Sequence, residues 1–326
     1  MTTTAYPLLL QPVYMDYIWG GNRISQRYGR LNTPKVCAES WEIADRPEGM
    51  STVINGAHKG RTLQDLVKSM KHDLLGKKVN SDRFPLLIKM IDAKKDLSVQ
   101  VHPNNKNASL TSGEAKTEMW YILDAEPNAM IYAGMKPGIT QPAFEAALAA
   151  NSLESTVLAK VPAKPGRTIF VPGGRIHAIG AGCLLLEIQQ NSNTTYRVHD
   201  WGRVGKDGTP RELHLEKALK VIDWNNSSPE LMPARPLESE SNNQWWSIID
   251  CPFFKTNRIE LRHPEEVSHD GSSFHALFVT KGTALIGANG IMASAKAGTS
   301  CLVPAAATNY TITPLAGSAT VIQITL

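Results

Sequence analysis

Short apolar segments, separated at brief intervals by Gly, Pro and Asn, recur along almost the whole chain. Many of them alternate apolar and polar residues, which is typical of strands with one buried face. None approaches the roughly 20 apolar residues that are needed to span a bilayer. The pattern therefore predicts a mainly β fold and argues against a role in a membrane.

The segments fall into two series with a polar stretch between them. In the first series we expect strands at 40–44, 86–90, 97–102, 118–123, 129–133, 167–171, 183–189 and 195–198. Helices are expected at 62–70, at 145–150 after Gln141, and at 212–221 after Pro210. In the second series we expect strands at 254–261, 274–281, 283–286, 300–304 and 320–325. The polar, Pro-containing stretch 225–244 is interpreted as a linker, which predicts an N-terminal domain of residues 1–230 and a C-terminal domain of residues 231–326.

Charge and cysteine content narrow the class of protein. The 34 Lys and Arg residues exceed the 30 Asp and Glu residues by four, and this excess is spread along the chain. Such a balance gives no support for a nucleic-acid partner and is compatible with a small anionic substrate. The four cysteines lie far apart, form no C-x-x-C pair and follow no secretory signal. We therefore expect reduced thiols in a cytoplasmic protein.

Residues that can bind a metal ion occur in three segments. Alternation places Ser98, Gln100 and His102 on one face of a strand. By the same rule Lys116 and Glu118 share a face in the next segment. The polar groups of each segment are therefore expected to point to one side.

The third segment contains His177, which follows the turn Pro172-Gly173-Gly174, and Glu187 alternates with apolar neighbours on the next expected strand. Two imidazoles, one carboxylate and one amide oxygen form a mixed N/O donor set that suits Zn²⁺ or a similar divalent ion. On the residues alone, histidines with purely structural partners explain the pattern equally well.

Several segments, in order from about residue 7 to residue 224, resemble the type I mannose-6-phosphate isomerases. They are Trp19-Gly20-Gly21, Glu39-Ser40-Trp41-Glu42-Ile43-Ala44-Asp45, Gln100-Val101-His102-Pro103, Lys116-Thr117-Glu118-Met119-Trp120-Tyr121, Ile176-His177-Ala178-Ile179 and Thr195-Tyr196-Arg197-Val198. The resemblance implies a cupin fold of two jelly-roll β-barrels with a few added helices. We expect the second barrel to be metal-free, because His275 stands at a position suited to a ligand but lacks the partner residues found in the first half. The resemblance also implies a zinc-dependent interconversion of mannose 6-phosphate and fructose 6-phosphate.

The resemblance also assigns roles by motif position. The ligands of one Zn²⁺ per chain would be Gln100, His102, Glu118 and His177. Ser98 and Lys116 match positions associated with the substrate or its phosphate, and Arg197 matches an arginine near the reacting sugar. The implied partner is a small sugar phosphate.

This reaction requires a group that moves a proton between C2 and C1 of the sugar. Arg197 is always protonated, so it would stabilise the negative charge of the enediolate rather than act as the base. Glu187 and Lys116 are the candidates, because burial raises the pKa of a carboxyl group and a nearby metal ion lowers that of a lysine. We place Glu187 first, since Lys116 would also be a phosphate partner.

Structural alternatives exist for several of these residues. Ser98 could bond only to a neighbouring strand, Arg197 could pair with Asp200, and Glu187 could be the buried partner of an arginine. Arg175, after the glycine turn, could contact the phosphate or point to solvent. His199 is expected at the surface, with a role in proton transfer as the alternative.

Two other functions are compatible with a cupin fold. One is a sugar-binding protein without turnover, and the other is a metal-dependent oxygenase in which iron replaces zinc. The presence of all ligand-type residues together with Lys116 and Arg197 argues against the first, and analysis of the bound metal would distinguish the second.

Overall fold

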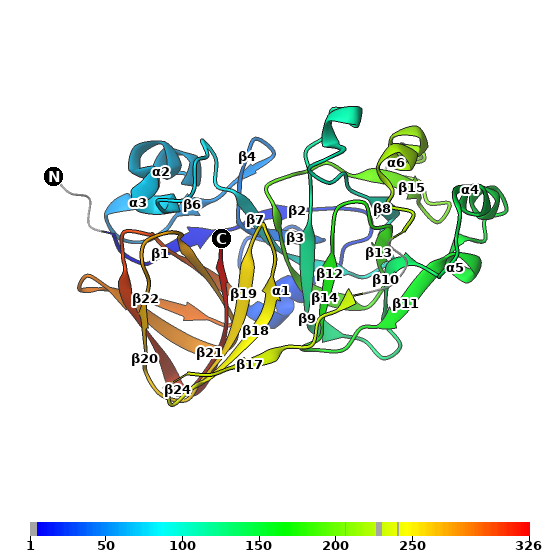
Figure 1. The fold of residues 1–326 in the computed structure, drawn as a ribbon. Coiled ribbons are helices and arrows are strands. Elements are labelled where there is room, and N and C mark those ends of the chain that lie inside the picture. Colours follow the sequence, from blue (N-terminus) through cyan, green and yellow to red (C-terminus); the bar gives the residue numbers. More distant parts are fainter. Residues whose placement is uncertain (1–4, 206, 226–229, 240) are drawn as a thin grey trace. The chain divides into compact units, whose positions relative to one another are not determined.

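The structure is a computed structural model, and it describes residues 5–205, 207–225, 230–239 and 241–326 (Figure 1). Strands predominate, as the sequence predicts. The chain forms two compact units: unit 1 comprises 1–13, 41–87 and 233–326, and unit 2 comprises 14–40 and 88–232. Within the expected linker, residues 226–229 and 240 lie outside the described residues. The division into domains at residue 230 stays a prediction.

Unit 1 is built on a ten-stranded antiparallel sheet in the order β17-β18-β19-β24-β21-β23-β1-β6, with β20 and β22 paired to β24 and β21. The N-terminal strand thus lies beside β23, with Leu8 opposite Leu302. The strand bounds are β1 Leu8–Gln11, β6 Thr52–Val53, β17 Arg235–Leu237, β18 Gln244–Asp250, β19 Lys255–Leu261, β20 Glu265–Ser268, β21 His275–Ala288, β22 Ile291–Lys296, β23 Thr299–Val303 and β24 Asn309–Thr325. A small pair, β4 (Asp45–Arg46) and β5 (Gly49–Met50), is separate.

The strands expected in the second series are present, and two of them, β21 and β24, extend beyond the predicted ranges. Segments 274–281 and 283–286 form the single strand β21, and 320–325 is the last part of β24. Gly282 was the apparent break, but its positive φ of 74° is accommodated where the register between β21 and β24 shifts. A glycine can therefore mark an irregularity inside a strand rather than its end.

A polar cluster interrupts the apolar face of the unit 1 sheet. Leu277 and Val279 belong to the core, and His275 follows the same alternation on β21. Its Nδ1 lies 2.8 Å from the Tyr310 hydroxyl and 3.3 Å from the Gln323 amide nitrogen. Burial, together with the neighbouring His269, lowers the pKa of His275 to about 3, although Asp270 opposes this.

This cluster predicts a pH dependence of the stability of the chain. The unfolded chain binds a proton at His275 below about pH 6.5, whereas the folded chain excludes it down to about pH 3. The stabilisation is therefore complete above pH 6.5 and is lost as the pH falls through this window. Between pH 6.5 and pH 4 we expect His275 to account for about 3 kcal/mol of the decrease in unfolding free energy. Urea unfolding of wild type and His275→Gln would measure it, and parallel curves would refute it.

Unit 2 consists of two sheets with an apolar core between them. The five-stranded sheet has the order β11-β10-β13-β8-β15, and the seven-stranded sheet has the order β16-β12-β9-β14-β7-β3-β2. Three strands of the seven-stranded sheet contain residues assigned to unit 1. Strands β2 and β7 begin with such residues, and β3 ends with them. The bounds are β2 Val13–Met15, β3 Glu39–Ile43, β7 Leu86–Ala93, β8 Val99–Val101, β9 Glu118–Ala125, β10 Met130–Met135, β11 Leu158–Pro162, β12 Thr168–Val171, β13 His177–Ile179, β14 Cys183–Gln190, β15 Tyr196–His199 and β16 Glu230–Leu231.

Helices cover the other face of the five-stranded sheet in unit 2. Val99 and Val101 of β8 pack in one cluster with Phe144 of α4, Leu153 of α5 and Ala218 of α6. This sheet is therefore buried on both faces, and successive residues of its strands point to two different interiors. The helix bounds are α1 Arg23–Tyr28, α2 Leu63–Met70, α3 His72–Leu75, α4 Gln141–Ala149, α5 Leu153–Thr156 and α6 Leu215–Val221, with short 3₁₀ helices η1 Gly56–His58 and η2 Ala108–Thr111.

The three predicted helices are all present. Thr62 caps α2 through a reciprocal pair of hydrogen bonds with Asp65, so the predicted start is confirmed. Helix α4 begins earlier than residue 145, because Thr140 caps it and a proline stands in its first turn. Helix α6 begins at Leu215 rather than at residue 212. Sequence reasoning missed the short helices α1, α3 and α5.

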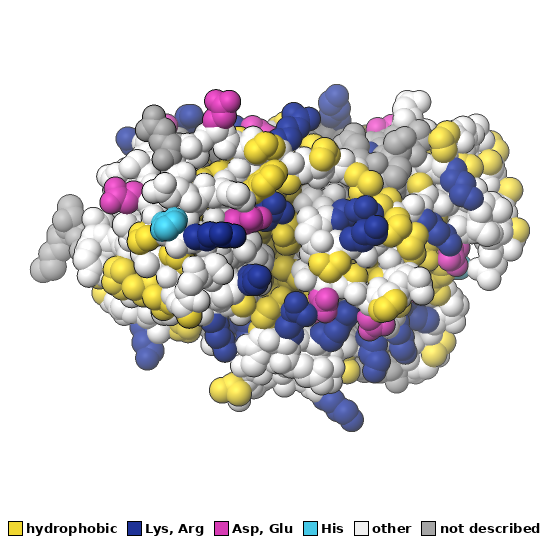
Figure 2. All heavy atoms as spheres, turned by 90° about the horizontal axis from the view of Figure 1, so that it is seen from below, with side chains coloured by type: hydrophobic (Ala, Val, Ile, Leu, Met, Phe, Trp, Pro, Cys, Tyr) yellow, Lys and Arg dark blue, Asp and Glu magenta, His cyan; other side chains and the backbone are white. Residues whose placement is uncertain are grey.

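Figure 2 shows one face of the molecule, on which Lys and Arg side chains are interspersed with acidic and hydrophobic ones. All four cysteines are free thiols. In the part of the chain that is described, no helix combines the length and the apolar character that a membrane span requires.

Candidate metal centre and cavity

Strand β8 and its two neighbours carry polar side chains into the space between the sheets of unit 2. Val99 and Val101 point toward the helices, so Gln100 between them points the opposite way. Gln100 stands opposite His177 on β13 and Arg197 on β15. Directly paired residues of antiparallel strands share a face, so these three side chains project to the same side.

The seven-stranded sheet contributes charged groups in the same way. Trp120 of β9 and Ile91 of β7 lie in the apolar core between the sheets. Glu118 and Lys89 stand two residues from them on the same strand faces. On β14, Glu187 stands two residues from Leu185, which belongs to the same core, and so it lies on the same strand face. One region of the interior is therefore apolar and an adjoining region is charged.

The turn Pro172-Gly173-Gly174 brings His177 beside His102. A Cβ atom on Gly173 would lie 2.7 Å from backbone atoms of the segment that follows His102, and Gly174 has a φ of +95°. The Gly174 N–H donates to the carbonyl oxygen of His102 at 2.7 Å. The two glycines thus allow a close backbone approach that a side chain would prevent.

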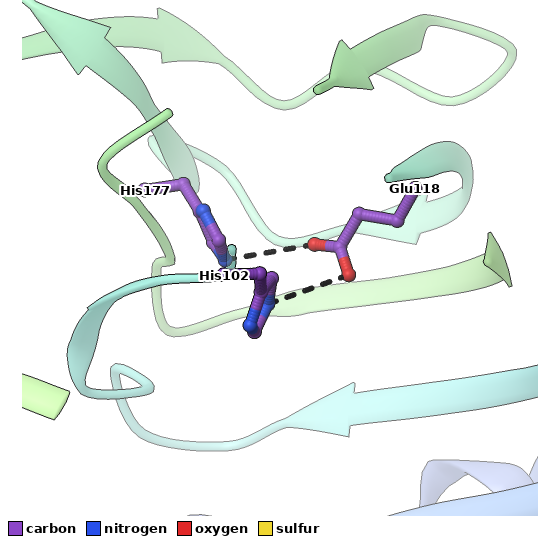
Figure 3. A group of neighbouring side chains, drawn as sticks. All are labelled: His102, Glu118 and His177. Carbon is purple, nitrogen blue, oxygen red and sulfur yellow. Dashed lines mark ion pairs between the residues drawn. The ribbon is translucent and has the colours of Figure 1, made fainter. Parts of the chain in front are cut away.

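His102, Glu118 and His177 form a buried cluster (Figure 3). The Nε2 atom of each imidazole lies 3.6 Å from a different oxygen of the Glu118 carboxylate. All the potential ligand atoms lie within 4.8 Å of one another, and the two ring centroids are 4.7 Å apart. The structure therefore brings together three of the four predicted ligands.

Backbone hydrogen bonds set the orientation of both imidazoles. His102 Nδ1 lies 2.8 Å from the carbonyl oxygen of Thr194, and His177 Nδ1 lies 2.8 Å from that of Arg175. Because a carbonyl oxygen only accepts, each Nδ1 carries the proton and each Nε2 presents a lone pair. These lone pairs converge on the Glu118 carboxylate, which is also an acceptor. Such buried acceptors are stabilised by a cation, so the cluster fits a divalent metal ion.

Gln100 lies at the edge of this cluster. Its amide nitrogen is 3.3 Å from His177 Nε2, while its amide oxygen is 3.4 Å from the Ser98 hydroxyl. The side chain is thus within reach of the metal-binding atoms. It also makes Ser98 a neighbour of the same site.

A network of buried charges lies next to the cluster. Lys116 Nζ is 2.8 Å from Glu118 Oε2 and 3.5 Å from Glu187 Oε1. Lys89 Nζ is 3.2 Å from the same Glu187 oxygen and 3.3 Å from Glu39. The indole N–H of Trp120 donates to the other Glu187 oxygen at 2.9 Å. Two ammonium groups and three carboxylates therefore alternate along the interior.

The charge network determines the protonation of its members. Burial lowers the pKa of His177 to about 3 and that of His102 well below its ordinary value, so both imidazoles are neutral. Burial and the charge of Glu187 raise the pKa of Glu118 to about 7. Burial would also raise the pKa of Glu187, but Lys116 and Lys89 outweigh it and lower the value to about 2. The expected increase for Glu187 is wrong, because the sequence did not reveal its two lysine partners.

A cavity of about 310 Å³ opens beside the cluster in unit 2. Its walls include Ser98, Gln100, Lys116, Glu187 and Arg197, all of which are predicted site residues. This volume is within the range of sites for small molecules, and the lining is more polar than is usual. The cavity therefore suits a small, charged and hydroxylated compound.

Three further charged residues of the cavity wall were not predicted from the sequence. Glu39, Lys89 and Arg211 all line it. Lys89 stands between Ile88 and Met90 in a mostly apolar strand, and a charge at such a position needs a buried partner, which is a signal in the sequence. Arg211 lies in a polar loop and carries no comparable signal.

The structure decides among the structural alternatives. Asp200 pairs with Arg203 and Arg211 rather than with Arg197. The partners of Glu187 are lysines and not an arginine. The alternatives proposed for Arg197 and Glu187 are therefore both wrong.

Arg175 and His199 lie apart from the cavity wall as described. Arg175 is only 2% exposed and donates to the carbonyl oxygen of Phe170, so the alternative in which it points to solvent is wrong. It affects the cluster through its own carbonyl group, which orients His177. His199 is half-buried and packs edge-on against Trp201 at 5.1 Å between ring centroids.

Comparison with known proteins agrees with this arrangement. Residues 8–137 match the family model of the catalytic domain of type I phosphomannose isomerase, and residues 247–325 match that of the mannose-6-phosphate isomerase cupin domain. Mannose-6-phosphate isomerase ManA of Bacillus subtilis is 39% identical over 260 residues, covering 79% of this chain and 80% of the relative. The mannose-6-phosphate isomerase of Streptococcus mutans is 37% identical and covers 79% of both chains.

Solved structures show the same fold. The crystal structure of mannose 6-phosphate isomerase from Bacillus subtilis has a TM-score of 0.89 at 32% identity, covering 98% of this chain and 99% of the other. A variant of phosphomannose isomerase from Salmonella typhimurium has a TM-score of 0.77 at 17% identity, covering 98% of each chain, which shows the fold alone. The expected cupin fold is thus confirmed, although its sheets are not closed barrels. The chain belongs to the type I mannose-6-phosphate isomerase family.

Proposed function

We propose that the chain interconverts D-mannose 6-phosphate and D-fructose 6-phosphate through an enediolate, with one Zn²⁺ per chain. The family supports the reaction. The observation that carries the metal requirement is the convergence of two Nε2 lone pairs on the Glu118 carboxylate, next to a polar cavity. A mixed set of imidazole and carboxylate ligands with an open position is typical of catalytic zinc.

His102, Glu118 and His177 would hold the ion, and Gln100 is the proposed fourth ligand. Rotation of the Gln100 amide by a half turn exchanges its oxygen and nitrogen, which would place the oxygen near His177 Nε2. When bound, the ion supplies a Lewis acid that stabilises negative charge developing on the sugar oxygens.

Glu187 is the proposed proton carrier between C2 and C1. Lys89, Lys116 and Trp120 hold its carboxylate ionised and oriented, which is the form that accepts a proton. Lys116 lies between Glu118 and Glu187 and would donate a hydrogen bond to a substrate oxygen. Arg197 would add positive charge near the enediolate, and Ser98 would bind a substrate hydroxyl.

We further propose that the enzyme acts in the cytoplasm, since its four cysteines are free thiols. The C-terminal cupin domain, residues 231–326, is proposed to carry no metal. Its buried His275 is engaged by Tyr310 and Gln323, so its surroundings differ from those of the convergent cluster in unit 2.

The function is tested by turnover of mannose 6-phosphate before and after chelation, and again after Zn²⁺ is restored. We expect activity to fall at least a hundredfold with the chelator and to return with zinc. Absence of turnover in the zinc-loaded protein would favour a sugar-binding cupin without catalysis. Oxygen consumption by an iron-loaded protein would favour the oxygenase.

A further inference from the structure

Gln189 is a buried amide next to the metal cluster that takes no part in the proposed reaction. It stands directly opposite Glu118 across β14 and β9, so the two side chains project from the same face of the sheet. The residue is completely buried. An amide at such a position has exchanged its hydrogen bonds with water for contacts inside the protein, and these contacts indicate what it does.

Two hydrogen bonds fix the amide group of Gln189. Its Nε2 donates to the carbonyl oxygen of Ser192 at 2.7 Å and to that of Gln190 at 2.8 Å. Because both partners are carbonyl oxygens, the amide cannot be turned over without placing its own oxygen against them. Both of its N–H groups are therefore committed to the end of β14 and the backbone that follows.

The oxygen of the same amide has no comparable use. Gln189 Oε1 is buried and has no hydrogen-bond partner among the residues that the structure describes. A buried acceptor without a partner lowers the stability of a folded chain. The side chain is thus explained by what its two N–H groups hold rather than by its own contribution to stability.

The backbone held by Gln189 is the irregular segment 191–195, which connects β14 to β15. Without a sheet ladder, the direction of each carbonyl group in it depends on individual hydrogen bonds. The Ser192 hydroxyl donates to the carbonyl oxygen of Glu114 at 3.0 Å and accepts from the N–H of Thr194 at 3.2 Å. The Thr194 hydroxyl accepts from the N–H of Glu114 at 2.9 Å. A continuous series of hydrogen bonds therefore leads from Gln189 through Ser192 to Thr194.

This series ends at the contact that orients one metal-binding imidazole. His102 Nδ1 donates to the carbonyl oxygen of Thr194 at 2.8 Å, so Nε2 is the atom presented to a cation. His177 is oriented by the carbonyl oxygen of Arg175, which lies outside segment 191–195. The two imidazoles are thus oriented by separate parts of the backbone, and the part that orients His102 is the one held by Gln189.

On the basis of the proposed function, in which His102 binds Zn²⁺, we propose that Gln189 is a positioning residue of the metal centre. Its amide holds the Ser192 carbonyl, Ser192 holds Thr194, and the Thr194 carbonyl sets the tautomer and ring orientation of His102. Hydrogen bonds that orient a metal-binding imidazole typically change metal affinity by about 10- to 100-fold. Gln189 thus acts on metal affinity through the backbone.

The first test compares the two imidazole protons in Gln189→Met, which keeps the length of the side chain but has no N–H group. NMR of the zinc-loaded protein with isotope-labelled histidines measures the exchange of each Nδ1 proton with solvent. We expect exchange at His102 to be at least about tenfold faster than in wild type, because its acceptor is no longer held. His177 is the internal control and should change by less than about threefold, since Arg175 is unaffected.

The second test measures zinc affinity by competition with a chelator, under conditions in which each protein is folded. Gln189→Met is expected to bind Zn²⁺ at least about tenfold more weakly than wild type. Gln323→Met is the matched control, because Gln323 is a buried amide of unit 1 that donates to the Tyr310 hydroxyl at 3.1 Å. It should lower stability but change zinc affinity by less than about threefold, since its partners lie away from the cluster.

Equal acceleration of the His102 and His177 protons, or wild-type zinc affinity in Gln189→Met, would overturn the proposal. If this variant does not fold, Ser192→Ala removes the next link of the same series and should accelerate the His102 proton alone. An unchanged rate in Ser192→Ala would refute the proposal equally. A wild-type protein that binds no Zn²⁺ would instead refute the proposed function, and the two imidazole protons would still decide whether Gln189 orients His102.

Discussion

Replacing Glu118 by Gln is expected to remove the bound metal ion and to lower turnover at least about a thousandfold. Glu118 supplies the only negative charge among the three clustered ligands, and each of its oxygens faces one imidazole. A neutral amide of the same shape is a weak ligand for a divalent ion. Metal content per chain, measured on purified protein together with kcat, checks this result.

Glu39→Gln provides the matched control for the Glu118 variant. Glu39 is a buried carboxylate of the adjacent cavity wall that pairs with Lys89 and is not one of the three clustered ligands. The control should therefore keep its metal ion. If Glu118→Gln retained a full complement of metal, the cluster would not be the metal site.

Replacing Glu187 by Gln is expected to lower kcat at least a hundredfold while the metal ion stays bound. The amide keeps the size of the side chain but cannot accept the C2 proton. Exchange of the C2 hydrogen with solvent should fall by the same factor as kcat, because both depend on the same proton removal. Mass spectrometry of substrate incubated in D₂O measures the exchange.

A parallel variant identifies the alternative proton carrier. Lys116→Gln removes the other candidate, which lies 3.5 Å from Glu187. If Glu187→Gln still exchanged the C2 hydrogen and Lys116→Gln did not, Lys116 would be the base. Loss of metal from Glu187→Gln would instead assign Glu187 a structural role.

Much of the fold and of the site is predictable from local patterns. The alternation of Val99 and Val101 with Gln100 and His102 correctly predicts that the two polar side chains leave the apolar face. The cap at Thr62 likewise predicts the start of a helix. Both features depend on neighbours along the chain, so the sequence contains them directly.

Other features depend on partners that are distant in the sequence. Lys89 and Glu39 form an ion pair although they are 50 positions apart in the sequence. Lys89 also forms an ion pair with Glu187 of another strand. The low pKa of Glu187 follows from this meeting, and so the expected increase is wrong. The predicted break between two strands at Gly282 is wrong for a similar reason, because the partner strand β24 pairs with β21 on both sides of this glycine.

The sequence by itself determined the strand-rich character of the chain, the face on which each ligand-type side chain lies, and the family to which the motifs belong. Strand alternation has a period of two residues, so neighbouring positions are sufficient to specify it. Only the tertiary structure decided which charges share one interior, which imidazole nitrogen carries a proton, and where Arg211 meets Asp200. These properties arise where segments that are distant in the sequence come into contact in an interior of low dielectric constant. The energies of such contacts depend on distances that exist only after the sheets have packed.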